Sequence, residues 1–196
     1  KTDRIGHARQ LMARLVAGDR WDLVFNICEG LRGPSRESQV PAILDLCEIP
    51  HTFADACVMA VCLQKSLTKL VVREAGLPTP RSALVSELAD VDDVRLRYPL
   101  FAKPVKAAFS VLAKRFDSHG ELHAHTRFAW GERWVIEHLV EPFERIARRR
   151  LPQAGSAHRL MWEAPVSAEQ FNLDGYVWQG QATAIGVVDS IMYPGT

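Results

Sequence analysis

Residues 64–80 read QKSLTKLVVREAGLPTP, and this stretch decides the fold. Its first part continues an apolar run from Ala56, so the sequence predicts one long helix over residues 56–76 with Asp55 as its N-cap. Gly76 ends this helix, because glycine adopts the left-handed C-cap conformation easily, and the Pro-Thr-Pro that follows cannot continue a helix. The stretch therefore predicts a helix that runs into a short hinge.

Two lysines flank the hinge, Lys65 on the helix before it and Lys103 at the end of a short apolar strand after it. Lys69 shares a helix face with Lys65 because it lies four residues away, so the pair indicates either a nearby anion or a solvated face. Lys103 also has an alternative interpretation, a surface lysine whose stem packs on apolar neighbours. Two fixed ammonium groups on separate elements are suited to holding a polyphosphate. We therefore predict that Lys65 and Lys103 form a clamp for an anionic ligand.

Before the hinge, helical and strand patterns alternate. Helices are predicted over residues 5–17 and from Ser35 or Ser38 to Cys47, with Asp55 starting the next. Strands are predicted over residues 22–27 and 49–53, and a glycine-containing loop over residues 29–35. This order is typical of a parallel α/β unit, which we place at residues 1–79.

After the hinge, strands dominate. Further helices are predicted after Ser86, from Ser118 to about Phe128, and over residues 133–150. The predicted strands are residues 82–85, an antiparallel pair at 100–105 and 109–115, residues 159–163, and a hairpin of 170–178 and 181–190 around Gln179-Gly180. The fold class is therefore a parallel α/β segment followed by an α+β segment, with the second domain at residues 80–196.

Composition places the chain among ordinary globular proteins. It has 196 residues, 47% of them hydrophobic and 24% charged, which allows one or two domains. The net charge of +1 gives no reason to expect nucleic acid or a membrane as partner, and no apolar run approaches the roughly 18 residues that a membrane span needs. The four cysteines lack paired zinc spacing, and a reducing cytoplasm is the expected location.

Taken in order, these pieces resemble the ATP-grasp superfamily. The first half is similar to D-alanine–D-alanine ligases in Asp22-Leu23-Val24-Phe25-Asn26, in Glu29-Gly30 and in Ile49-Pro50-His51-Thr52. Residues 64–80 resemble the family's D-K-x-x-T-K helix and G-[IL]-P-T-P hinge, with Gln64 where the aspartate usually stands. Phe101-Ala102-Lys103-Pro104 resembles the strand with the second phosphate-binding lysine. From Lys103 onward the chain is more similar to ATP-grasp ligases related to carbamoyl-phosphate synthase and biotin carboxylase.

The resemblance implies a site for ATP. Lys65 and Lys103 would contact the phosphates, and Ser110 would belong to the flexible phosphate lid. The residues implied at the adenine and ribose are Glu163, Ala164 and Val166 of the adenine hinge, and Gln170 in place of the usual ribose glutamate. The residues implied on the substrate side are Glu29, which replaces a histidine of the alanine ligases, and Asp189 and Tyr193.

The resemblance also implies magnesium, which this superfamily holds with an acidic residue and an E-x-N motif downstream of the hairpin. No such residues precede Thr196, so we predict no metal ligand in this chain and expect those ligands beyond it. The leading strand of the first domain is also missing by this comparison. We therefore expect a partial pre-ATP-grasp domain and an incomplete ATP-grasp domain, with a small lid subdomain at about 80–160 and the start of a central subdomain at 161–196.

The implied function is that of an ATP-dependent ligase. It would join a small-molecule carboxylate to an amine or related nucleophile through an acylphosphate, with a homodimer as a possible assembly. Two alternatives stay open, a non-catalytic ATP-binding or regulatory module and an interaction scaffold that keeps only the fold. For the 196 residues alone we expect weak ATP binding and no turnover.

Overall fold

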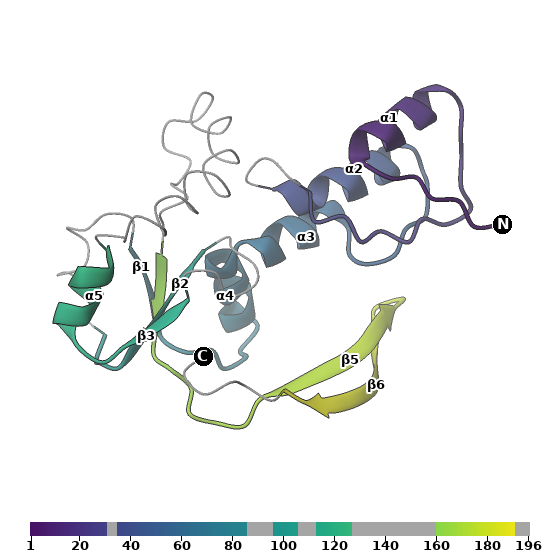
Figure 1. The fold of residues 1–196 in the computed structure, drawn as a ribbon. Coiled ribbons are helices and arrows are strands. Elements are labelled where there is room, and N and C mark those ends of the chain that lie inside the picture. Colours follow the sequence, from purple (N-terminus) through teal and green to yellow (C-terminus); the bar gives the residue numbers. More distant parts are fainter. Residues whose placement is uncertain (31–34, 86–95, 106–112, 127–159, 191–196) are drawn as a thin grey trace.

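The computed structural model describes residues 1–30, 35–85, 96–105, 113–126 and 160–190. Figure 1 shows a helical amino-terminal part, a small sheet with helices on either side, and a separate two-stranded hairpin. None of the helices in the described ranges is long and apolar enough to cross a membrane.

Two helices form most of the amino-terminal part. Helix α1 (Ala8–Val16) lies within the predicted residues 5–17 and starts late because His7 caps it. The His7 ring accepts a hydrogen bond from the Arg9 amide at 3.1 Å, while the His7 amide donates to the side chain of Gln10 at 2.7 Å. Helix α2 (Gln39–Leu46) follows a short 3-10 turn, η1 (Arg36–Ser38), which confirms the predicted helix up to about Cys47.

The two strands predicted in this part were too long. Only Val24 and His51 pair, in a single parallel bridge. The Val24 amide donates to the Pro50 carbonyl at 2.8 Å, and the Thr52 amide donates to the Val24 carbonyl at 2.9 Å. The side chains next to Val24 are exposed, and the described ranges contain no further strand to extend the pairing. The parallel direction was predicted correctly, and Val24 packs in a buried apolar cluster with Leu11, Leu15, Val40, Leu44 and Ile49.

The single helix predicted over residues 56–76 is two helices. Helix α3 (Ala56–Leu63) is capped as predicted, since the Asp55 carboxylate accepts from the amides of Cys57 and Val58 at 2.8 and 3.0 Å. The chain then leaves the helical conformation at Gln64, and α4 (Lys65–Glu74) begins. The Val61 carbonyl, which the Lys65 amide would reach in a continuous helix, instead accepts the Thr68 hydroxyl at 2.8 Å. The Val61 carbonyl also accepts the Gln64 amide at 3.1 Å, so a backbone bond and a side-chain bond both meet it at the break.

A four-stranded antiparallel sheet follows the hinge, in the order β1-β4-β2-β3. Its strands are β1 (Ser82–Val85), β2 (Leu100–Pro104), β3 (Lys114–Phe116) and β4 (Leu160–Glu163). They confirm the predicted strand positions, although residues 109–112 of the third strand lie outside the described residues. The predicted helices after Ser86 and at residues 133–150 also lie outside them. The predicted domain boundary at residues 79–80 stays a prediction.

The two faces of this sheet differ in character. One face is apolar and packs on helix α5 (His119–Thr126), and the buried cluster there is Val85, Leu100, Ala102, Phe116, Leu122, Leu160 and Trp162. Because side chains alternate along a strand, Lys103 and Glu163 fall on the opposite face. Figure 1 shows α5 on one side of the sheet and α4 on the other. The sheet thus turns its charged face toward α4.

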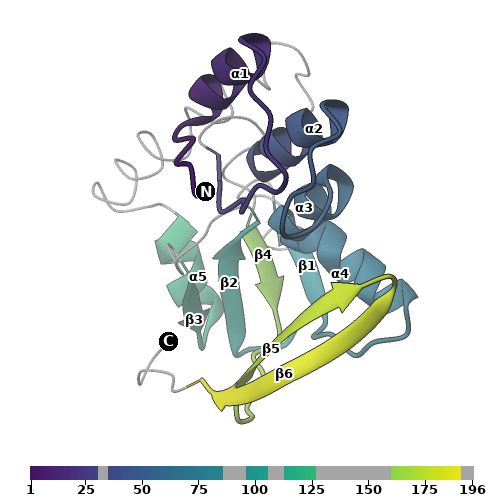
Figure 2. The same ribbon diagram turned by 90° about the vertical axis from the view of Figure 1, so that its right-hand side faces the viewer.

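A hairpin ends the described chain. Strands β5 (Phe171–Trp178) and β6 (Gln181–Asp189) pair around Gln179 and Gly180, whose φ angles are +49° and +75°. Two positive φ angles are those of the turn that suits a two-residue hairpin, so this prediction is confirmed. Figure 1 shows the hairpin apart from the four-stranded sheet, and in Figure 2 it crosses the lower end of the sheet in the view. Every residue of β5 and β6 is exposed.

Candidate functional site

Lys65 and Lys103 come from two elements that one backbone hydrogen bond joins. Lys65 is the first residue of α4, and its amide donates to the carbonyl of Val105 at 3.3 Å. Val105 lies two residues beyond Lys103, just past the end of β2. The helix break at Gln64 frees the Lys65 amide for this bond, so the break itself brings the two predicted phosphate-binding residues together.

The Lys65 ammonium occupies an unfavourable position for a positive charge. Burial is the main cause that lowers the pKa of Lys65, and the positive charges of Lys103 and Arg36 lower it further. The carboxylates of Glu37 and Glu163 act in the opposite direction. A desolvated cation beside other cations gains energy from an added anion, which is the property required of a polyphosphate site.

A buried carboxylate lies in the same place. The Glu163 residue is 8% exposed, and its side chain is held between two lysines. One oxygen, Oε1, pairs with the Lys103 Nζ, and the other, Oε2, lies 3.0 Å from the Lys69 Nζ. The Lys69 Nζ also donates to the Thr79 Oγ1 of the hinge at 2.8 Å. Glu163 is therefore a buried and paired carboxylate, although a glutamate at the end of a strand is usually exposed to solvent.

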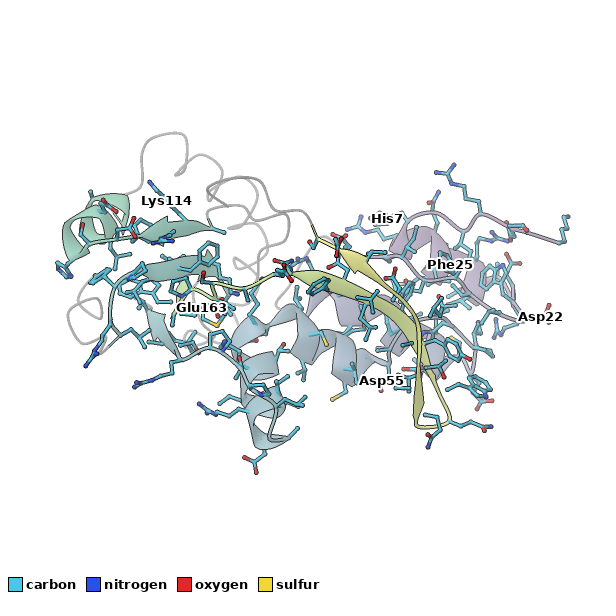
Figure 3. The ribbon with its side chains drawn as sticks, turned by 90° about the horizontal axis from the view of Figure 1, so that it is seen from below. His7, Asp22, Phe25, Asp55, Lys114 and Glu163 are labelled. Atoms are coloured by element: carbon cyan, nitrogen blue, oxygen red, sulfur yellow. The ribbon has the colours of Figure 1, made fainter. Side chains whose placement is uncertain are left out.

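The register of the sheet explains this arrangement. Glu163 is opposite Phe101 of β2, while Lys103 is opposite Met161, so Glu163 and Lys103 are diagonal neighbours on one face. Diagonal positions lie roughly 7–8 Å apart at the backbone, a gap that a lysine side chain spans. The Ala164 amide donates to the Arg81 carbonyl at 3.1 Å and fixes the end of β4 against the hinge. Figure 3 shows Glu163 in the sheet part of the molecule, far from Asp22 and Phe25.

Lys69 is a residue that the sequence interpretation did not assign to the site. Its spacing from Lys65 indicated either a nearby anion or a solvated face. The structure decides for the anion, which is Glu163, 94 positions away in the sequence. The four-residue spacing of Lys65 and Lys69 thus indicated an anion near this helix face, but the sequence alone did not identify Glu163 as that anion.

The chain is similar in sequence and in structure to known proteins. No family model matches the sequence. A D-alanine–D-alanine ligase of Xylella fastidiosa is 33% identical over 137 residues, which cover 66% of this chain and 45% of that protein. One from Thermoanaerobacter sp. (strain X514) is 30% identical over 132 residues, covering 63% of this chain and 36% of that protein. The D-alanine–D-alanine ligase structure from Coxiella burnetii has a TM-score of 0.62 at 22% identity, over 90% of this chain and 47% of that one.

The chain is similar in sequence to D-alanine–D-alanine ligases. Its fold is that of the ATP-grasp ligases, which confirms the predicted resemblance and the mixed helix-and-sheet class. The chain spans less than half the length of these relatives. The closer likeness of its second half to carbamoyl-phosphate-synthase and biotin-carboxylase relatives stays a prediction.

The other predicted ATP-grasp positions are less well defined than the lysines. Ala164 is partly buried beside Glu163, whereas Val166 is 70% exposed. Gln170 is exposed at the base of the hairpin, where its amide donates to the Ser190 hydroxyl at 3.3 Å. Ser110 of the predicted lid lies outside the described residues. The structure thus brings together Lys65, Lys103 and Glu163 among the residues predicted for ATP.

The predicted substrate-side residues are dispersed. Glu29 is exposed in the loop after the Val24 bridge, and Asp189 is exposed at the end of β6, paired with Phe171. Tyr193 lies outside the described residues. The structure gives these three positions no common centre, and their roles stay predictions.

The described residues offer no set of ligands suited to magnesium. Within these ranges, no group of three or more His, Cys, Asp or Glu side chains is placed to hold a metal ion. The carboxylate nearest the lysines, Glu163, is already paired with two ammonium groups. Magnesium prefers oxygen ligands in octahedral geometry, so the lysine-rich set found here does not fit it.

Proposed function

We propose that this chain carries the phosphate- and adenine-binding part of an ATP-dependent carboxylate–amine ligase. The observation that supports it best is the junction of α4 and β2, where the Lys65 amide bonds to the Val105 carbonyl and sets Lys65 beside Lys103. Two partly buried ammonium groups at one junction suit the adjacent phosphates of a nucleotide. The named activity of the relatives, D-alanine–D-alanine ligase, belongs to the same reaction class.

The reaction has two steps, in which atoms and charges balance. A carboxylate oxygen attacks the γ-phosphorus of ATP, a new O–P bond forms, and the bond from that phosphorus to the bridging oxygen breaks to release ADP. The amine nitrogen then attacks the acyl carbon of the acylphosphate, inorganic phosphate leaves with the C–O bond electrons, and the nitrogen loses a proton. Lys65 and Lys103 stabilise the charge that spreads over the phosphoryl oxygens in the first step.

Glu163 is proposed to recognise the adenine edge. Each carboxylate oxygen offers two lone-pair directions, so an oxygen that accepts from one lysine retains one for the amino group of adenine. Magnesium, which ATP-dependent ligases of this family use, would supply positive charge to the phosphates. The described residues include no suitable ligands for it, so no step of the reaction rests on it.

The two substrates are proposed only by class. The relatives' names specify D-alanine, but Glu29 stands where alanine ligases usually have a histidine. A glutamate differs from a histidine in charge and in hydrogen-bonding groups, so this position does not support carrying D-alanine over to this chain. We therefore propose a small carboxylate and an amine without specifying D-alanine, with Glu29, Asp189 and Tyr193 as the substrate-side candidates.

The test of the site is binding of ATP to the 196-residue chain. ATP at 100 times its dissociation constant is expected to stabilise the chain by about 2.7 kcal/mol, measured as a rise in melting temperature. Lys103→Met is expected to remove this rise, because the phosphate loses a direct charge partner. Lys114→Met is the matched control, since Lys114 is an exposed lysine on the same sheet. An equal rise in all three proteins would contradict the proposed site.

The test of the reaction uses the full-length protein with a candidate carboxylate and hydroxylamine. A ligase that forms an acylphosphate gives a hydroxamate, which ferric ion reveals by colour, and Lys103→Ala is expected to abolish it. A full-length protein that binds ATP yet gives neither hydroxamate nor ADP with a panel of small carboxylates would instead be the non-catalytic ATP-binding module.

A further inference from the structure

Three charged side chains from three elements form two ion pairs that share one carboxylate. Lys69 of α4, Lys103 of β2 and Glu163 of β4 carry two positive charges and one negative charge. Their side chains differ in exposure: 27% for Lys103, 16% for Lys69 and 11% for Glu163. Lys103 is thus the member of the group that an incoming ligand reaches first.

Lys69 is the member that is fixed. Its ammonium has two described acceptors, the Glu163 Oε2 at 3.0 Å and the Thr79 Oγ1 at 2.8 Å. One belongs to the sheet and the other to the hinge, so the Lys69 side chain connects α4, the hinge and β4. Lys103, by contrast, forms its ion pair with Glu163 among the described residues. A phosphate that takes Lys103 therefore removes one of the two positive charges beside Glu163.

We propose that Lys69 is a positioning residue that keeps the Glu163 carboxylate in place and neutralised, so that Lys103 can pass from Glu163 to a ligand phosphate. The inference rests on the proposed function, since it concerns the same site. In this scheme Glu163 holds Lys103 at the strand end until a polyphosphate arrives. After the transfer, Glu163 retains a one-to-one pair with Lys69.

Charge explains why Lys69 is needed. Removing one partner of a buried ion pair is strongly unfavourable, because it leaves an uncompensated charge away from water. Without Lys69, Lys103 is the remaining ion-pair partner of Glu163 in this group, and a phosphate has to break that pair. Lys69 thus affects phosphate binding through Glu163, with no contact of its own with the phosphate.

Binding of sodium tripolyphosphate to the 196-residue chain, measured by calorimetry, tests this scheme without any adenine contact. Lys69→Met is expected to weaken binding about tenfold, equivalent to about 1.4 kcal/mol, and Lys69→Arg is expected to restore most of the loss. Glu163→Gln is expected to bind at least as tightly as the unchanged chain, because the neutral amide no longer competes for Lys103. The double variant, Lys69→Met with Glu163→Gln, is expected to bind like Glu163→Gln alone. Lys114→Met is the charge-matched control and is expected to leave binding unchanged.

The double variant separates positioning from direct contact. If it binds as weakly as Lys69→Met, Lys69 contacts the phosphate itself and the inference is wrong. Unchanged binding in Lys69→Met would also overturn it. No tripolyphosphate binding by the unchanged chain would instead overturn the proposed phosphate site, and with it this extension. If Lys69→Met does not fold, Thr79→Val removes one of the two anchors of Lys69 and is expected to weaken binding about threefold, again only while Glu163 is present.

Discussion

The side chain of Lys65 at the α4–β2 junction is placed where an anionic ligand would stabilise it. The Lys65 ammonium is partly removed from water and faces other cations, so the ligand-free protein holds it at some cost. Strained or destabilising groups of this kind are common at binding sites, since the ligand relieves the cost when it binds. At this scale, burial and the neighbouring cations Lys103 and Arg36 disfavour the charged form of Lys65 more than an exposed position would.

This cost predicts a pH dependence for Lys65. Its pKa is lower in the folded chain than the ordinary value of 10.5, so the unfolded chain binds more protons in the interval between the two values. Stability therefore rises with pH across that interval and is lowest below the folded pKa. Lys65→Met is expected to remove this alkaline rise and to raise the stability of the ligand-free chain near pH 7. Urea unfolding between pH 7 and 10.5 measures it, and an equal rise in Lys65→Met and in the Lys114→Met control would be inconsistent with it.

At the scale of elements, the break between α3 and α4 matters most. The Thr68 hydroxyl takes the carbonyl that would otherwise continue the helix, and the Lys65 amide turns to β2 instead. The two helices therefore differ in their contacts. Helix α3 begins at the Asp55 cap, and α4 places Lys65 and Lys69 next to the sheet. The hydroxyl of Thr68 is therefore structural, while its neighbour Lys69 serves the site.

Thr68→Val tests this role. The variant keeps the side-chain shape but removes the hydrogen bond to Val61, so we expect a loss of about 1 kcal/mol in the free energy of unfolding. Ser66→Ala is the control, because no hydrogen bond of the Ser66 hydroxyl is found within the described residues. Urea unfolding of both variants gives the two values. Equal losses would show that Thr68 contributes only what any helix hydroxyl does.

How far the sequence predicts these elements depends on the range of the interactions that shape them. Alternating patterns and caps act locally, so β1, β4, the Asp55 cap and the hairpin turn at Gln179 were predictable. The break at Gln64 was not, because there the Lys65 amide bonds to the carbonyl of Val105, which lies just past β2 and far along the chain. Glu163 was expected in the site from its motif, but its pairing with Lys69 follows from the register of β4, which no local pattern specifies.

At the scale of the whole molecule, two apolar clusters lie on either side of the hinge. One contains Val40 and residues of α1 and α2, and the other contains Val85 and the apolar face of the sheet. The two share no member among the described residues. Helix α4 lies between the two clusters in the sequence, and its Lys69 connects the hinge to the sheet through Thr79 and Glu163.

The separation of the clusters predicts additive stability effects. Val40→Ala and Val85→Ala each remove buried methyl groups, at 6% and 4% exposure, and are expected to cost about 2 kcal/mol apiece. The double variant is expected to lose the sum within about 0.5 kcal/mol, because distant sites without shared partners act independently. Urea unfolding with a constant slope measures all three. A double variant that departs clearly from the sum would indicate that the two clusters are coupled.

The bond from the Lys65 amide to the Val105 carbonyl also has a practical consequence, since a single peptide proton reports on the junction of helix and strand. An amide that is hydrogen-bonded exchanges with deuterium only when that bond opens. Exchange at Lys65 therefore measures how often α4 and β2 separate, while the first-turn amides of α4 serve as an internal reference for fraying. A nucleotide that binds both lysines would slow exchange at this one position more than at its neighbours. This measurement follows nucleotide binding at the junction of α4 and β2 without turnover and without knowledge of the substrates.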